Sequence, residues 1–139
     1  MNICAVDGTA AMNISISDDQ LAELQIKFNV SFPSDYVSLL KWRNGFSLNN
    51  GLFIYSSDEL VERNAAFEVD RYASGYLAIG DDSGGRSIMI PLIGEGVYVV
   101  DQGSMDPDDF EKISTSLANW VAKGCALGET GPDRSLAHR

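Results

Sequence analysis

Few side chains in this sequence could perform nucleophilic or acid–base catalysis. His138 is the only histidine, and it is the penultimate residue. A catalytic histidine must be held against a nucleophile and an orienting group, and a polar chain end does not hold it there. The two cysteines, Cys4 and Cys125, lie near the ends in a spacing that matches no metal motif. We therefore expect no enzymatic activity, no metal and no cofactor.

A second place where chemistry is conceivable is the run Asp81-Asp82-Ser83-Gly84-Gly85. Paired carboxylates beside glycines could hold Mg²⁺ or cradle a phosphate. However, the glycines are not followed by the Lys-Ser or Lys-Thr pair that closes a P-loop, and no dinucleotide fingerprint opens a helix here. Asp, Ser and Gly are also the residues that form tight turns. We interpret the run mainly as a turn between strands, and we expect it to border a binding surface.

A third candidate is an acidic segment between residues 101 and 111. It contains five acids and no base: Asp101, Asp106, Asp108, Asp109 and Glu111. The acids do not alternate as the ligands of an EF-hand loop do. Two interpretations stay open, namely a solvated helix cap and part of an acidic surface for a basic partner.

The overall charge limits the partners. The formal net charge is −10, from 20 acids and 10 bases. This charge opposes direct binding to nucleic acid and to anionic membranes. Neither a long apolar run nor a secretory signal is recognisable, so a cytoplasmic location is expected. Such a charge favours a basic protein partner, although it also promotes solubility by itself. In a reducing compartment both cysteines are expected as thiols, with a disulfide between the chain ends as the alternative.

Aromatic residues complete the candidate site, because they dominate protein interfaces. Trp42 lies off the apolar helix face formed by Tyr36, Leu39 and Leu40, so it is expected to be partly exposed; packing against a sheet is the alternative. The predicted partner-binding residues are Trp42, Tyr55, Asp81, Asp82, Asp101, Asp108 and Asp109.

The elements that must position these residues are marked by capping and turn signals. Ser17 with Gln20, and Ser56 with Glu59, form capping-box patterns that start helices reaching residues 28 and 66. A third helix is expected over residues 34–43, and Asp106-Pro107 is expected to start a last helix that continues to Gly124 with Trp120 on its buried face. Strands are expected at residues 52–55, 76–79, 87–92 and 97–100.

This order of elements predicts an α+β fold, with a mainly antiparallel β-sheet meander flanked by helices. Residues 13–124 are expected to form a single domain. Residues 1–12 and 125–139 are expected to be flexible termini, because they lack apolar periodicity.

Several stretches of the chain resemble one known family. They are Phe32-Pro33-Ser34-Asp35-Tyr36, Leu52-Phe53-Ile54-Tyr55, Leu77-Ala78-Ile79-Gly80-Asp81-Asp82 with Gly84-Gly85, and Gly96-Val97-Tyr98. Their order and spacing, from about residue 17 to residue 123, resemble the SUKH superfamily in its SMI/KNR-type branch.

The resemblance implies an α+β fold and a function in binding rather than catalysis. Bacterial members are commonly immunity proteins that bind and block a cognate polymorphic toxin, often a nuclease. A nuclease cleft is basic because it holds phosphate, so an acidic inhibitor could imitate the charge of the nucleic acid. The alternative is a regulatory or scaffold module that has no toxin partner. The family supplies no catalytic residues.

Overall fold

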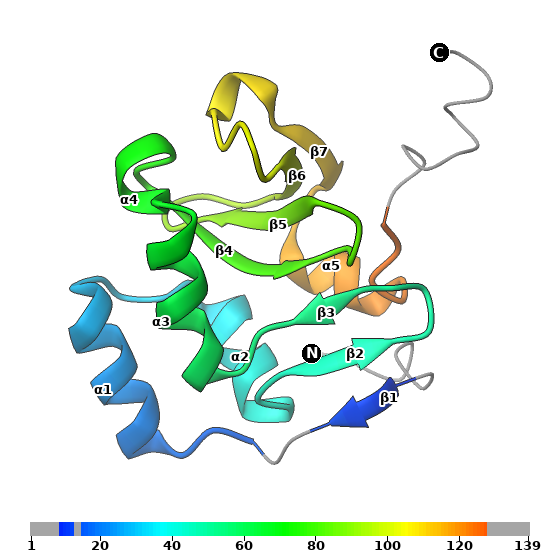
Figure 1. Ribbon diagram of the computed structural model, residues 1–139. Coiled ribbons are helices and arrows are strands. Elements are labelled where there is room, and N and C mark those ends of the chain that lie inside the picture. Colours follow the sequence, from blue (N-terminus) through cyan, green and yellow to red (C-terminus); the bar gives the residue numbers. More distant parts are fainter. Residues whose placement is uncertain (1–8, 13–14, 128–139) are drawn as a thin grey trace.

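The core of the fold is one antiparallel sheet. The computed structural model describes residues 9–12 and 15–127. In these residues seven strands follow one another in the sheet in their order along the chain, as Figure 1 shows. The strands are β1 (Thr9–Met12), β2 (Phe46–Leu48), β3 (Phe53–Ile54), β4 (Tyr76–Asp81), β5 (Arg86–Pro91), β6 (Val97–Asp101) and β7 (Glu111–Ser114). The predicted α+β meander is therefore confirmed.

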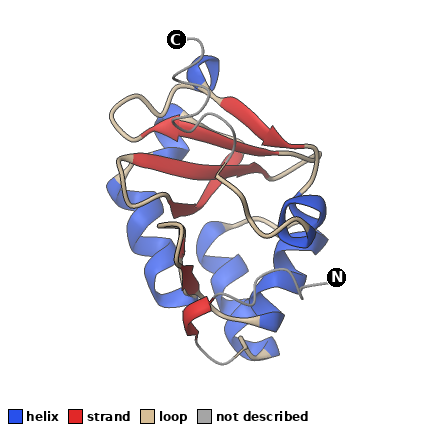
Figure 2. Ribbon diagram, turned by 90° about the vertical axis from the view of Figure 1, so that its right-hand side faces the viewer, coloured by secondary structure: helices blue, strands red, loops and turns tan. Residues whose placement is uncertain are grey.

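Helices flank this sheet (Figure 2). The described helices are α1 (Asp18–Phe28), α2 (Ser34–Trp42), α3 (Ser57–Ala66), α4 (Val69–Tyr72), the 3₁₀ helix η2 (Pro107–Asp109) and α5 (Leu117–Ala122). Both predicted capping boxes are present. The Ser17 hydroxyl accepts a hydrogen bond from the Gln20 N–H at 3.1 Å, and the Gln20 side chain accepts one from the Ser17 N–H at 3.0 Å. The same reciprocal pair joins Ser56 and Glu59 at the start of α3.

The central strands are buried on both faces. Ile88 and Ile90 of β5 belong to the main core, which α1, α2, α3 and α5 cover, whereas Met89 between them belongs to a second core with Val69 of α4 and Met105. Successive side chains of a strand point to opposite faces, so this alternation assigns one core to each face of the sheet. Burial on both faces explains why β4 to β6 are continuously apolar in sequence.

Outside the segment that follows β6, the sequence interpretation missed β1, β2 and α4. β1 and β2 pair with each other, β2 pairs with β3, and α4 lies between α3 and β4. β2 has three residues and α4 has four, and neither length covers enough residues to display a period. The Asn49-Asn50-Gly51 turn connects β2 to β3.

The prediction of one helix over residues 106–124 is wrong. Asp106 caps only η2, residues 111–114 form β7 against β6, and α5 begins at Leu117. Phe110 packs instead against Tyr76 and Tyr98, with its ring centroid 4.8 Å from that of Tyr76. Ser114, Thr115 and Ser116 interrupt the helical pattern, because short hydroxyl side chains favour caps over helix interiors. The prediction that Trp120 is buried is confirmed, since 2% of it is exposed.

The described parts of the two terminal segments contact the rest of the domain. Thr9–Met12 form β1, whose backbone pairs with β2. At the other end Cys125 is a fully buried free thiol, and the Trp120 indole donates a hydrogen bond to the Ala126 carbonyl at 2.7 Å. Residues 1–8 and 128–139, including Cys4 and His138, lie outside the described residues.

Candidate protein-binding surface

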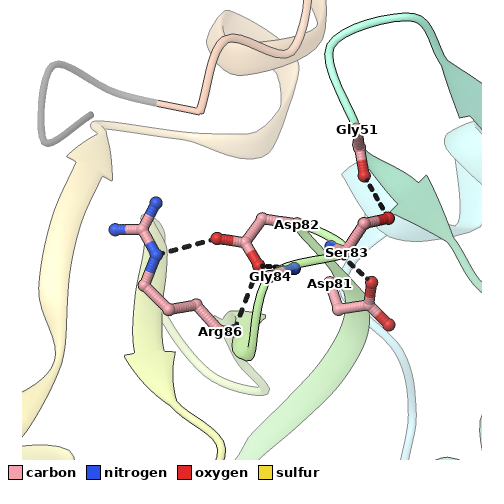
Figure 3. A network of polar contacts seen from close by, with 6 residues as sticks. All are labelled: Gly51, Asp81, Asp82, Ser83, Gly84 and Arg86. Atoms are coloured by element: carbon pink, nitrogen blue, oxygen red, sulfur yellow. Dashed lines mark hydrogen bonds and ion pairs between the residues drawn. The ribbon is translucent and has the colours of Figure 1, made fainter. Parts of the chain in front are cut away.

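The Asp82 carboxylate organises the β4–β5 turn (Figure 3). It accepts hydrogen bonds from the Gly84 N–H at 2.7 Å and from the Arg86 N–H at 3.1 Å. It also accepts one from the Arg86 guanidinium at 2.8 Å. Only 10% of the Asp82 side chain is exposed. The Asp82 carboxylate therefore stabilises the turn, in agreement with the interpretation of this run as a turn.

These contacts also set the ionisation of Asp82. Burial raises the pKa of its carboxyl group, but the hydrogen bonds from Arg86 and Gly84 and the Arg86 charge favour the carboxylate. Together they hold the pKa of Asp82 below its ordinary value. The group stays ionised at neutral pH and presents little free charge to a partner.

Asp81 joins the turn to the core. Its carboxylate accepts a hydrogen bond from the Ser83 N–H at 2.9 Å and another from the Tyr55 hydroxyl at 2.9 Å. The Ser83 hydroxyl donates to the Gly51 carbonyl at 2.6 Å, which ties the β2–β3 turn to the β4–β5 turn (Figure 3). Tyr55 itself is fully buried, and that burial, with the negative charge of Asp81, raises its pKa. Tyr55 holds the Asp81 carboxylate by this hydrogen bond from within the core, and it is too buried to contact a partner.

Asp101 connects this turn to the acidic segment. It ends β6, and its Cα pairs with that of Arg86 across the sheet. The Gln102 N–H donates to the Gly85 carbonyl at 2.8 Å, so the two connections are held side by side. The Asp101 carboxylate accepts a hydrogen bond from the Gly103 N–H at 2.7 Å, and the residue is exposed.

The other acids follow in the β6–β7 connection. The Asp106 carboxylate caps η2 by accepting from the Asp108 N–H at 2.9 Å, and the Ser104 hydroxyl donates to the Asp109 carboxylate. Asp101, Asp106, Asp108 and Asp109 are all exposed, and we call these four residues the acidic surface. Met105, which is 2% exposed, anchors this loop in the second core. The carboxylates are thus carried on a loop that is fixed to the sheet.

Trp42 is not part of this arrangement. It is half-buried at the end of α2, packs against the main core and meets the Phe46 ring at a centroid distance of 5.6 Å. The Arg43 guanidinium lies 4.2 Å from the centre of the Trp42 ring. Phe46 begins β2, whereas Gly51, which contacts the β4–β5 turn, follows the end of β2. Both interpretations of Trp42 therefore hold in part, since it packs on the core and keeps some exposure.

Comparison with known proteins now decides the family. The model of the SMI1 / KNR4 family (SUKH-1) matches residues 15–123, which includes every strand from β2 to β7. The chain belongs to the SUKH-1 family. It is also 30% identical over 83 residues to "Uncharacterized protein YnaB" of Bacillus subtilis (strain 168). That match covers 60% of this chain and 56% of the relative, so the chain spans little more than half of that protein's length.

Membership of SUKH-1 agrees with a binding role for the fold. The family includes immunity proteins, which generally act without catalysis. Among residues 15–127, no three His, Cys, Asp or Glu side chains converge as metal ligands would. No helix in the described part of the chain is long and apolar enough to cross a membrane.

One set of surface residues escaped the sequence interpretation of this SUKH-1 chain. Ile93, in the β5–β6 connection, is 92% exposed and adjoins the half-buried Leu92. This connection lies at the opposite end of the β4–β5 hairpin from Asp82, because Tyr76 pairs with Pro91 and Asp81 pairs with Ser87. The available signal was an isoleucine placed directly before the glycine-rich turn Gly94-Glu95-Gly96, where polar residues are usual.

Proposed function

We propose that this protein is an immunity protein that binds and neutralises a cognate polymorphic toxin through its acidic surface. A nuclease is the toxin class that the charge favours. The observation that carries the proposal is the exposure of Asp101, at the end of β6, and of Asp106, Asp108 and Asp109, on the anchored loop that follows it in a SUKH-1 fold. Exposed carboxylates on a fixed support keep their charge available for a partner, unlike Asp82, whose charge is compensated by Arg86.

The mechanism is electrostatic attraction followed by blockade of the toxin's site. A nuclease cleft is lined by cations that hold phosphate, and the acidic surface offers four carboxylates in place of phosphates. The net charge of −10 extends the attraction beyond the contact itself. The toxin is inhibited because the bound domain occupies the cleft that the nucleic acid would enter.

Co-expression provides the test. The product of the neighbouring gene would be expressed in cells from an inducible promoter, with and without this protein, and growth would be followed. We expect the neighbour alone to stop growth and the pair to restore it. A pull-down with the tagged immunity protein should recover the toxin in a one-to-one complex.

Two results would count against this function. A neighbour that is harmless, or whose toxicity persists at full expression of this protein, contradicts immunity. Recovery of a non-toxic partner whose activity changes on binding would instead favour the regulatory or scaffold alternative.

A further inference from the structure

A second surface of the molecule combines apolar residues with carboxylates. A pocket of about 420 Å³ lies between the end of α1, α3 and the start of β4, and Phe28, Val61 and Leu77 line it. An adjoining pocket is formed by Val30, Tyr76, Pro91 and Ile93. A third, of about 250 Å³, lies between the start of α2 and the β5–β6 connection, beside Leu117.

The three pockets lie next to one another, because they share lining residues. Leu92 lines all of them, Val30 and Tyr76 line the first two, and Pro33 and Pro91 line the last two. We call this feature the apolar groove. Its lining residues include the start of β4 and the end of β5, which lie at the same end of the sheet. The acidic surface follows β6 at the other end of these strands.

The charges along the groove indicate what would occupy it. Asp70 lines one end, and Asp35 and Glu95 line the other. Lys27 is the single base among the lining residues that the structure describes, and it lines the same end as Asp70, so the stronger negative charge lies at the end with Asp35 and Glu95. An apolar floor with carboxylates at both ends is complementary to a segment whose apolar side chains are flanked by lysine or arginine.

Two other occupants fit less well. A second copy of this chain would bring another net charge of −10 against these carboxylates, which opposes self-association. An anionic membrane is repelled for the same reason. The exposure of Ile93, at 92%, places a large apolar side chain at the edge of the groove, where a docking segment would cover it.

We propose that the apolar groove is a docking site for a partner protein's apolar segment flanked by basic residues. The proposal goes beyond immunity, because it concerns a different end of the sheet and does not require the partner to be a toxin. Ile93, Leu92 and Tyr76 provide the apolar contact. Asp70, Asp35 and Glu95 receive the basic flanks.

Selection of peptides tests the groove directly. A random 12-residue peptide library would be selected on the immobilised full chain, and enriched peptides would be synthesised for fluorescence anisotropy. We expect apolar residues between lysines or arginines in the enriched sequences. Ile93→Ser should weaken their binding by about tenfold or more, and Asp70→Asn with Glu95→Gln should weaken it several-fold at low salt.

The matched control is Ile26→Ser, which removes another exposed isoleucine, 76% exposed on α1, that does not line the groove. It should leave peptide binding unchanged. Thermal melts of each variant verify the fold, since Ile93 is too exposed for its replacement to cost stability. Enriched peptides that are acidic, that bind Ile93→Ser as well as the parent, or that are absent altogether overturn the proposal. If the wild-type protein is a dimer and Ile93→Ser makes it monomeric, the groove binds a second copy of this chain and the proposal is wrong.

Discussion

At the scale of single residues, the predicted site separates into residues that support the surface and residues that present it. Tyr55 and Asp82 were predicted to bind a partner because of their type. In the structure Tyr55 is fully buried and Asp82 is bonded to Arg86 and Gly84. Asp101, Asp108 and Asp109 keep exposed carboxylates. Residue type alone could not distinguish the two groups, because burial depends on which strands meet.

Asp82→Asn should lower the free energy of unfolding at pH 7 by about 1.5–3 kcal/mol, the usual contribution of hydrogen bonds to a charged group. The pKa of Asp82 is lowered in the fold, so its carboxylate stabilises the protein above the unfolded pKa of about 3.8. That stabilisation is lost as the pH falls below this value through the folded pKa. Urea unfolding at pH 7 and near pH 3 should therefore show a difference from wild type that shrinks with acid.

The control for this charge change is Glu62→Gln, which replaces an exposed carboxylate on α3. It should change the stability by less than about 0.5 kcal/mol. A deficit of Asp82→Asn that is equally large at both pH values would contradict the ionic role assigned to Asp82.

Tyr55→Phe tests whether Tyr55 stabilises Asp81 or contacts the partner. Removing the hydroxyl that donates to the Asp81 carboxylate at 2.9 Å should cost about 1.5–3 kcal/mol of stability. The affinity for the partner, measured at a temperature where the variant is folded, should stay the same. A loss of affinity without a loss of stability would indicate that Tyr55 contacts the partner directly.

At the scale of elements, signals confined to a few residues predicted the structure well. The capping boxes at Ser17 and Ser56 located α1 and α3, and the apolar runs located β4, β5 and β6. The helix predicted after β6 is absent from the structure. Phe110, Ile113 and Leu117 have helical spacing, but they lie on a loop, a strand and a helix. The pairing of β7 with β6 is a non-local contact that outweighs local spacing, and no single-sequence pattern reveals it.

Ser116→Ala tests the corrected boundary. The Ser116 hydroxyl accepts a hydrogen bond from the Asn119 N–H at 3.0 Å and caps α5. Its loss should cost about 0.5–2 kcal/mol in chemical denaturation. If one helix covered residues 106–124, Ser116 would lie in its interior, and alanine would be neutral or stabilising there. A variant that is as stable as the parent would therefore support one continuous helix over residues 106–124.

At the scale of the whole molecule, the sheet separates two surfaces of different character. The acidic surface follows the end of β6, while the apolar groove lies where β4 begins and β5 ends. The net charge predicted a basic partner, and the family resemblance indicated a binding protein. The position of the groove depends on the packing of α1, α3 and the β5–β6 connection, which composition does not encode.

The acidic surface should act mainly on the rate of association, since exposed charges attract a partner over about a Debye length and salt screens them. Asp108→Asn combined with Asp109→Asn removes two charges and leaves Asp106 as the cap of η2. An asparagine at 109 also keeps an acceptor for the Ser104 hydroxyl. The control Glu23→Gln with Glu62→Gln removes two exposed charges from α1 and α3.

The most direct test is stopped-flow association of these proteins with the purified toxin domain at low and at high salt, with melting curves as a check on folding. The acidic-surface variant should associate several-fold more slowly than wild type at low salt and nearly equally at high salt. Its dissociation rate should be almost unchanged, and the control variant should stay close to wild type. Equal association rates for wild type and the acidic-surface variant at low salt would contradict recognition of the toxin through these carboxylates.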